Sequence, residues 1–307
     1  MANETQPITR AGFVAIAGAP NVGKSTFLNQ VLGVKVAITC DKPQTTRHRL
    51  LGVYNREGLQ IVFLDTPGLH QANRALNRMM VRTAVEALKE ADAALFMVEA
   101  TPRGLVEASQ IVDILTEAAR PTVVALNKID LVKNKAELLP MIEEISSWGQ
   151  WKAIVPTSAI KNEGLEEVIN ELEPLIPEGP PLFPPDMITD LPVRFLAGEI
   201  IREKIFHLTH KEVPYSTAVE VEQFIEPEED SDRPVVISAT IYVERPSQKA
   251  IIIGKEGAML KRIGTAARKE LELLLGRKVF LELYVKVEPN WTRREQGLKK
   301  VGYRPLG

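Results

Sequence analysis

The sequence predicts an α/β domain with a mostly parallel sheet, followed by a smaller α+β domain. Short apolar segments alternate with helical patterns between residues 12 and 176, which is typical of a parallel sheet with helices on both faces. A proline-rich stretch then interrupts regular structure. We therefore expect a first domain over residues 1–177, a stiff linker over 178–190 and a second domain over 191–307. The six prolines are Pro174, Pro177, Pro180, Pro181, Pro184 and Pro185.

Buried strands of the first domain should be the short apolar runs that are bounded by turn residues. Arg49–Asn55 and Leu59–Asp65 flank the short turn Arg56–Gly58, so we expect a hairpin whose first strand is antiparallel and lies at the sheet edge. The expected strands are Gly12–Gly18, Leu59–Asp65, Ala93–Glu99, Thr122–Asn127 and Ala153–Thr157. The expected helices are Lys24–Leu32, Ala72–Ala91, Leu105–Ala119, Ala136–Trp148 and Leu165–Ile176.

The second domain has a different order of elements. We expect a helix, two strands joined by the acidic turn Glu226–Asp232, two helices and a last strand. In chain order these are Arg194–Thr209, Thr217–Ile225, Val235–Val243, Ser247–Ile252, Ala258–Leu274 and Lys278–Val287.

A phosphate-binding loop is predicted where the first strand meets the first helix. Gly18–Ser25 has the spacing Gly-x-x-x-x-Gly-Lys-Ser, in which glycines let backbone N–H groups surround phosphates. The start of the helix adds the positive end of its dipole. Lys24 should reach the β- and γ-phosphates, and Ser25 should bind Mg²⁺. The expected phosphate-binding residues are Gly18, Asn21, Val22, Gly23, Lys24, Ser25, Thr26 and Gly68.

The Mg²⁺ site should include a carboxylate from a later strand. Asp65 ends an apolar strand, and Gly68 follows where a backbone N–H could meet the γ-phosphate. The polar segment 39–48 lies between these motifs, and its adjacent Thr45 and Thr46 are candidates for binding Mg²⁺ and the γ-phosphate.

A guanine site is predicted after two further strands. The Asp130 carboxylate offers two acceptors, which match the N1–H and N2–H₂ donors of guanine and not the edge of adenine. Asn127 should brace the loops and contact the base, and the Lys128 stem should pack over the ring. The backbone N–H of Ala159 should meet the guanine carbonyl. The expected guanine-binding residues are Asn127, Lys128, Asp130, Ser158 and Ala159, so GTP and GDP are the expected nucleotides.

An RNA-binding loop is predicted in the second domain. Gly254–Gly257 has the Gly-x-x-Gly pattern between a short and a long helix, as in KH domains, which clamp single-stranded RNA. The order of elements matches a type II KH domain. Residues 245–307 carry 15 Lys+Arg against 6 Asp+Glu, whereas residues 1–244 carry 23 against 34, so a polyanionic partner is favoured. The expected RNA-binding residues are Gly254, Lys255, Glu256, Gly257, Lys261 and Arg262, followed by a basic C-terminal tail.

Composition narrows the classes of protein. The 307 residues are 45% hydrophobic, which is enough for two cores, yet no apolar run approaches the ~20 residues of a membrane helix. Residues 1–10 lack the apolar core of a signal peptide. The single Cys40 fits a reducing compartment. We expect a cytosolic protein.

Together, these motifs resemble the Era family of bacterial GTPases, which join a P-loop GTPase domain to a C-terminal KH domain. The resemblance extends over nearly the whole chain. It implies a GTP-hydrolysing, RNA-binding, monomeric assembly factor for the small ribosomal subunit that binds the 3′ end of the small-subunit rRNA. It also implies a peripheral contact with the inner membrane. The residues that carry it are Gly18–Ser25, 44–49, 65–70, Asn127–Asp130, 157–159, 213–215, 242–249 and 253–257.

The resemblance also refines the catalytic site. By likeness to related GTPases, Thr46 is preferred to Thr45, so the expected Mg²⁺ residues are Ser25, Thr46 and Asp65. Leu69 occupies the place of a glutamine that orients water in many small GTPases, and leucine cannot hydrogen-bond water. Asn21 resembles the asparagine of GTPases that bind K⁺, so K⁺ is a second candidate cofactor.

Two alternatives stay open from the sequence. A GTP-controlled scaffold could carry a KH-like domain that binds protein, although Gly254, Gly257 and the basic tail favour RNA. A tRNA-modification GTPase would resemble this chain only in its first domain.

Overall fold

The computed structural model describes residues 9–40, 42, 46–47, 49–69, 75–228 and 231–303. The chain divides into two compact units. Of the described residues, the first contains 9–69 and 79–190, and the second contains 75–78 and 191–303. Each unit is described by itself.

The first unit is built on a six-stranded sheet in the order β2-β3-β1-β4-β5-β6. Neighbouring strands are parallel, except that β2 is antiparallel to β3 and lies at the edge, as predicted from the hairpin turn. The central strands are buried on both faces, which explains their continuous apolar sequences. The strands are β1 (Arg10–Gly18), β2 (Leu50–Arg56), β3 (Leu59–Asp65), β4 (Ala93–Glu99), β5 (Thr122–Asn127) and β6 (Ala153–Pro156).

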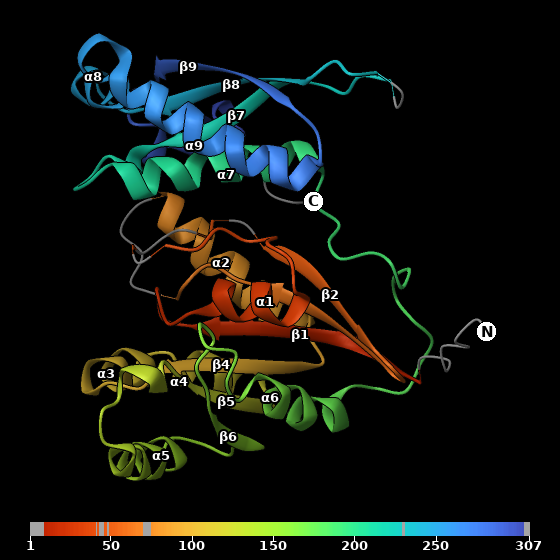
Figure 1. The fold of residues 1–307 in the computed structure, drawn as a ribbon. Coiled ribbons are helices and arrows are strands. Elements are labelled where there is room, and N and C mark those ends of the chain that lie inside the picture. Colours follow the sequence, from red (N-terminus) through yellow and green to blue (C-terminus); the bar gives the residue numbers. More distant parts are fainter. Residues whose placement is uncertain are drawn as a thin grey trace. The chain divides into compact units, whose positions relative to one another are not determined.

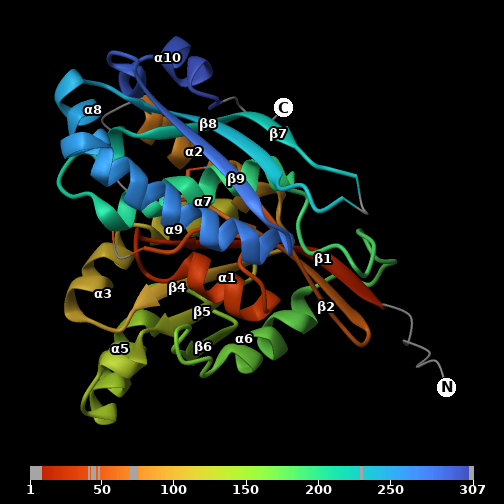
Figure 2. The same cartoon turned by 45° about the horizontal axis from the view of Figure 1, so that its top comes forward.

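Helices cover both faces of this sheet. In Figures 1 and 2, α1 (Lys24–Leu32) and α6 (Leu165–Leu172) lie on the face turned to the viewer, whereas α2 (Ala75–Glu90) lies behind it. Among the described residues, no helix is long and apolar enough to cross a membrane. The remaining helices and 3-10 turns of the unit are α3 (Pro102–Ser109), α4 (Val112–Ala118), α5 (Leu138–Ser146), η1 (Ile129–Leu131), η2 (Lys135–Glu137) and η3 (Glu173–Leu175).

The single helix predicted over Leu105–Ala119 is wrong, because two short helices replace it. The first begins earlier than expected, since Thr101 caps it by accepting a hydrogen bond from the Gly104 N–H at 3.0 Å and Pro102 fits its first turn. It ends at Ser109, and Ile111 N–H then bonds to Ala108 O in a tight turn. Ile111 is buried there, so the break keeps an apolar side chain in the core.

The segment predicted as a linker is hydrogen-bonded to the β2–β3 hairpin. The wholly buried Gln60 side chain accepts from the N–H groups of Leu182 and Phe183 at 2.6 and 2.9 Å. It also donates to Phe183 O at 2.9 Å. Further along, Val53 N–H donates to Ile188 O at 2.8 Å, so this segment follows the outer edge of β2.

The second unit has a three-stranded sheet in the order β7-β8-β9. Strand β8 is antiparallel to β7 and parallel to β9, and helices α7 and α9 cover one face (Figure 1). This is the element order expected for a type II KH domain. The elements are α7 (Val193–Leu208), η4 (Pro214–Ser216), β7 (Ala218–Ile225), β8 (Val235–Val243), α8 (Pro246–Ile253), η5 (Lys255–Gly257), α9 (Ala258–Leu275) and β9 (Val279–Val287).

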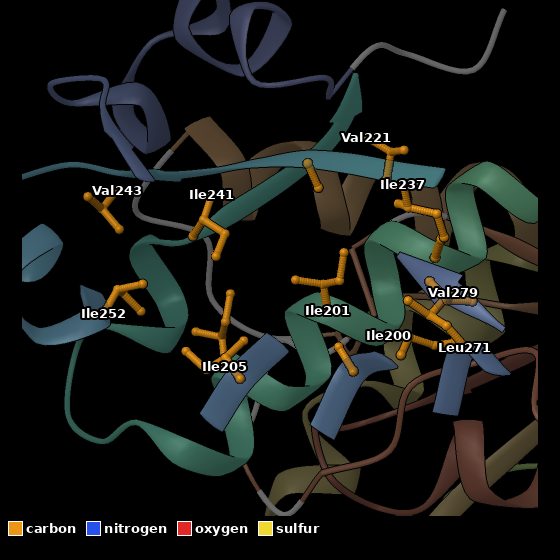
Figure 3. Close-up of a cluster of buried hydrophobic side chains, with 14 of the residues drawn as sticks. Ile200, Ile201, Ile205, Val221, Ile237, Ile241, Val243, Ile252, Leu271 and Val279 are labelled. Carbon is orange, nitrogen blue, oxygen red and sulfur yellow. The ribbon is translucent and has the colours of Figure 1, made fainter. Parts of the chain in front are cut away.

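The core of the second unit lies between this sheet and its helices. Figure 3 shows Ile201 and Ile205 of α7 among side chains of the sheet, including Ile237 and Ile241 of β8. All four are fully buried. Ile252 of α8 joins the same cluster, so this core also anchors the helix that leads into the Gly-x-x-Gly loop.

The expectation of a plain basic tail is incomplete, because the chain folds through residue 303. Trp291 is fully buried, donates its Nε1–H to Ser216 O at 3.0 Å and stacks on Tyr303 with ring centroids 5.6 Å apart. Gly297 is required for this packing, since a Cβ there would lie 2.6 Å from Trp291 Cα. The added elements are η6 (Trp291–Arg293) and α10 (Glu295–Lys300).

Replacing Gln60 by leucine should destabilise the first unit. The substitution leaves the N–H groups of Leu182 and Phe183 without their acceptor, at a cost of about 1–3 kcal/mol. Urea unfolding followed by circular dichroism should show the loss, while the exposed Gln150→Leu should leave the midpoint unchanged. An unchanged midpoint in Gln60→Leu would show that the docked segment adds no stability.

Candidate functional site

A pocket of about 480 Å³ lies at the carboxyl ends of the parallel strands of the first unit. This edge is where ligands bind in open α/β sheets. The predicted phosphate and guanine residues meet here, although they come from separate motifs. The described residues that line it are Pro20, Asn21, Gly23, Lys24, Ser25, Thr26, Ile38, Thr39, Cys40, Thr46, Gly68, Asn127, Lys128, Asp130, Leu131, Ala159 and Ile160.

Glycine is required both within the phosphate loop and in a second segment that approaches it. Gly23 has a φ of 104°, and a Cβ there would lie 2.3 Å from Asn127 Nδ2. Gly68 approaches the loop so closely that a Cβ would lie 2.8 Å from Pro20 N. Asn21 also has a positive φ, of 64°, which asparagine tolerates better than most residues. Gly18 and Val22 were also predicted to bind phosphate but are not among the described lining residues.

Lys24 at the start of α1 lies buried beneath the loop. Its ammonium donates to the carbonyl oxygens of Gly18 and Ala19 at 3.2 and 2.9 Å. Burial lowers the pKa of Lys24 to about 8, and the attraction of Asp65 offsets part of this shift. The protein therefore holds a desolvated cation at the place where the sequence predicts phosphate oxygens.

The three predicted Mg²⁺ residues converge beside this lysine. Ser25 Oγ donates to Asp65 Oδ2 at 2.8 Å and lies 2.9 Å from Thr46 Oγ1. Thr46 Oγ1 lies 3.4 Å from the same carboxylate oxygen. The three residues predicted to bind Mg²⁺ thus lie together, whereas Thr45 lies outside the described residues.

The Asp65 carboxylate has the environment of a cation ligand. Burial raises its pKa to about 6, against the lowering effect of Lys24 and of the Ser25 and Thr46 hydroxyls. Its Oδ1 is buried and accepts no hydrogen bond from the part of the chain that the structure describes. A hard cation such as Mg²⁺ prefers oxygen ligands of this kind, so the side chains fit the metal that the motif predicts.

Asn127 connects the phosphate loop to the base site. Its Nδ2 donates to Val22 O at 2.7 Å. Its Oδ1 accepts from Ala159 N–H at 2.9 Å and from the Thr157 hydroxyl at 3.3 Å. The predicted bracing role matches this geometry.

Side chains around the base end of the pocket are also held in place. The fully buried Ser158 is outside the described pocket lining, and its hydroxyl donates to Asp130 Oδ1 at 2.6 Å. Lys128 has a left-handed backbone with a φ of 67°, and its Nζ donates to Glu99 Oε2 at 2.6 Å.

Several residues of the pocket wall were not predicted from the sequence. Leu131 and Ile160 are 62% and 71% exposed and flank the base end. The sequence could have predicted both, because each is an apolar residue directly after a guanine-binding motif. Ile38, Thr39 and Cys40 come from the segment after α1, where the sequence has no regular pattern to place them.

The Gly-x-x-Gly loop of the second unit joins α8 to α9. Gly254 has a φ of 73°, and a Cβ there would lie 2.7 Å from Met259 Cβ, so glycine is required. Gly257 has a φ of 78°, and a Cβ there would meet none of the described atoms. The predicted RNA-binding side chains Lys255, Glu256, Lys261 and Arg262 are all exposed on this loop and the first turns of α9.

The fold and pocket of the first unit, with the KH topology and loop of the second, define a P-loop GTPase that carries a KH domain. Family models agree with both parts. One described as "50S ribosome-binding GTPase" matches residues 13–128, and one described as "KH domain" matches residues 212–292.

Relatives extend the likeness over the whole chain. GTPase Era of Geobacter metallireducens is 51% identical over 96% of this chain and 98% of its own length. GTPase Era of Geotalea uraniireducens is 50% identical over 97% and 99%. The chain belongs to the GTPase Era family and is an enzyme that hydrolyses GTP.

Two solved Era structures share the fold. A point variant of Aquifex aeolicus Era bound to GDP.AlF4⁻ is 45% identical with a TM-score of 0.90, over 96% of this chain and all of that one. An Era in complex with MgGDPNP and nucleotides 1506–1542 of 16S ribosomal RNA is 45% identical with a TM-score of 0.91, over 97% of this chain and all of that one.

Asp65→Asn should stabilise the nucleotide-free protein while impairing its reaction. The folded state raises the pKa of Asp65, so the ionised carboxylate costs stability above pH 6 and none below pH 4. In EDTA at pH 8 the variant should gain about 1–2 kcal/mol. That gain should vanish as the pH falls towards 4.

Hydrolysis of GTP with Mg²⁺ should fall by about 100-fold in Asp65→Asn, because a charged ligand is lost. Thermal unfolding and phosphate release measure the two effects, and the exposed Asp186→Asn is the matched control. Normal hydrolysis would remove Asp65 from the metal site.

Proposed function

We propose that this GTPase is an assembly factor for the small ribosomal subunit, in which the KH domain binds the 3′ end of the small-subunit rRNA under control of the bound nucleotide. The observation that carries this is the presence, in one chain, of a pocket lined by the predicted GTP-binding motifs and an exposed Gly-x-x-Gly loop, which is followed on α9 by the exposed Lys261 and Arg262. The full-length relative bound to nucleotides 1506–1542 of 16S ribosomal RNA supports the choice of RNA.

The description of the matching GTPase model names the 50S subunit, which is the large one. That model matches the first domain alone and says nothing about RNA bound by the second. The protein in the 16S complex matches both domains of this chain and therefore supports binding of small-subunit RNA.

Phosphate binding would rest on Lys24, the loop N–H groups and the helix start. Ser25, Thr46 and Asp65 would hold Mg²⁺, which neutralises charge on the phosphate oxygens when bound. The relative in complex with MgGDPNP supports this metal.

K⁺ is a further candidate cation. The Leu69 side chain is 2% exposed and apolar, so it does not take the water-orienting role of a glutamine. Asn21 lines the pocket on the phosphate loop, where a bound K⁺ would add positive charge. A cytosolic location stays a prediction from composition. The monomeric state and the peripheral membrane contact stay predictions from the family resemblance.

Asp130→Asn should shift nucleotide preference from guanine to xanthine. The asparagine amide can donate to the xanthine carbonyl, where the aspartate would face an acceptor. Ser158→Ala is a useful comparison, because it removes the hydroxyl that orients Asp130 and keeps the carboxylate. Competition of GTP and XTP for a fluorescent nucleotide measures the shift. If GTP remains preferred in Asp130→Asn, Asp130 does not read the base.

Lys255→Asp combined with Glu256→Asp should weaken binding of a 16S 3′-end oligonucleotide by about 100-fold or more. Both side chains are exposed, and aspartate tolerates the left-handed φ of 51° at position 256, so the loop keeps its glycines and its fold. Basal GTP hydrolysis should persist.

The control for the loop variant is Lys278→Asp, which has the same change of charge at an exposed site beyond the far end of α9. Filter binding at several salt concentrations measures the affinity. Wild-type affinity in the loop variant would mean that RNA uses another surface or that the KH domain binds protein instead.

K⁺ should stimulate GTP hydrolysis severalfold relative to Na⁺ at equal ionic strength, and Asn21→Ala should remove the difference. Phosphate release in matched KCl and NaCl tests this. Equal rates in the wild-type protein would exclude K⁺ as a cofactor.

A further inference from the structure

The ion pair between Glu99 and Lys128 joins the ends of two neighbouring strands at the base end of the pocket. Glu99 ends β4 and Asn127 ends β5, and the two are partners in the parallel register. The N–H of Ala100 donates to Asn127 O at 2.8 Å. This backbone contact brings the carboxylate of Glu99 within 2.6 Å of Lys128 Nζ.

The pair is neither open to solvent nor buried. The side chains of Lys128 and Glu99 are 29% and 26% exposed. An ion pair in this setting is screened less than one on an open surface. Lys128 lines the pocket together with Asp130, whereas Glu99 is not among its described lining residues, so the carboxylate acts on the lysine from outside the pocket.

Glu99 itself is fixed by the helix that follows. Its carbonyl accepts from Thr101 N–H at 2.7 Å. Gly104 of α3 packs against it so closely that a Cβ at 104 would lie 2.4 Å from Glu99 O. The guanidinium of the nearby Arg103 donates to Glu107 at 2.8 Å and also attracts the Glu99 carboxylate. The backbone of Glu99 is thus held between β4 and the start of α3.

We infer that Glu99 is a positioning residue for guanine nucleotides, because its carboxylate holds the Lys128 ammonium and fixes the lysine stem along the base end of the pocket. A lysine side chain on a free stem loses rotamer entropy when it must cover a ligand. The ion pair with Glu99 already restricts the Lys128 side chain in the free protein, so less rotamer entropy is lost when the nucleotide binds. This inference rests on the proposed role of Lys128 in guanine binding.

A double-mutant cycle on the full chain tests the inference. Glu99→Ala should weaken binding of fluorescent GDP about fivefold, equivalent to about 1 kcal/mol. Glu99→Gln should weaken it less, because its amide oxygen still accepts a hydrogen bond. In a Lys128→Ala background, Glu99→Ala should have no further effect, since its partner is gone. Glu86→Ala, which breaks the exposed ion pair with Arg82 on α2, is the matched control.

Steady-state kinetics separates positioning from catalysis. In Glu99→Ala the KM for GTP should rise and kcat should stay unchanged, because contacts to the base are equal in the ground and transition states. If Lys128→Ala weakens GDP and Glu99→Ala does not, or if Glu99→Ala acts equally in both backgrounds, the inference is wrong and the base site stands. If Lys128→Ala binds GDP normally, the inference and the role of Lys128 are both wrong, whereas the role of Asp130 is tested by its own variant.

Discussion

The nucleotide pocket depends on one buried amide. Asn127 is 2% exposed and holds three backbone segments together, since its Nδ2 bonds to the phosphate loop at Val22 and its Oδ1 bonds to Thr157 and Ala159. A buried amide that loses a partner costs about 1–3 kcal/mol, so the loops are constrained to one arrangement. The same amide excludes any side chain at Gly23. The loop predicted to bind phosphate and the segment predicted to bind the base therefore share one support.

Around that support the protein keeps two charged groups in a poorly solvated place. Lys24 and Asp65 are 6% and 0% exposed, and burial shifts the pKa of each towards its neutral form. Such a site is preorganised for ligands that bring opposite charge, because the desolvation cost is already included in the folded state. Because burying Lys24 and Asp65 costs desolvation energy, the empty domain is less stable than it would be with neutral side chains at these two positions. Functional sites commonly show this exchange of stability for binding.

Sequence reasoning succeeded where the physical signal was local. The strand Leu59–Asp65 and the helix Lys24–Leu32 were predicted to the residue, because buried runs and turn glycines mark their ends. It failed where distant residues decide the structure. Trp291 donates a hydrogen bond to the carbonyl of Ser216, which is 75 residues away in the chain. No local sequence pattern predicts such a contact. For the same reason the motif at Lys128 revealed the base site, while Glu99 became visible only once the register of two strands was known.

The docked segment after the first domain also bears on the exposure of the edges of the sheet. An edge strand with unpaired N–H and C=O groups can recruit another chain into an intermolecular sheet. Here the Val53 N–H and the Leu51 carbonyl on the outer edge of β2 already bond to Ile188 and Thr189. The covering segment is itself a poor template, because Pro180, Pro181, Pro184 and Pro185 carry no N–H donors. At the opposite edge, β6 is only four residues long. The first domain thus carries a sheet whose two margins are both protected against aggregation.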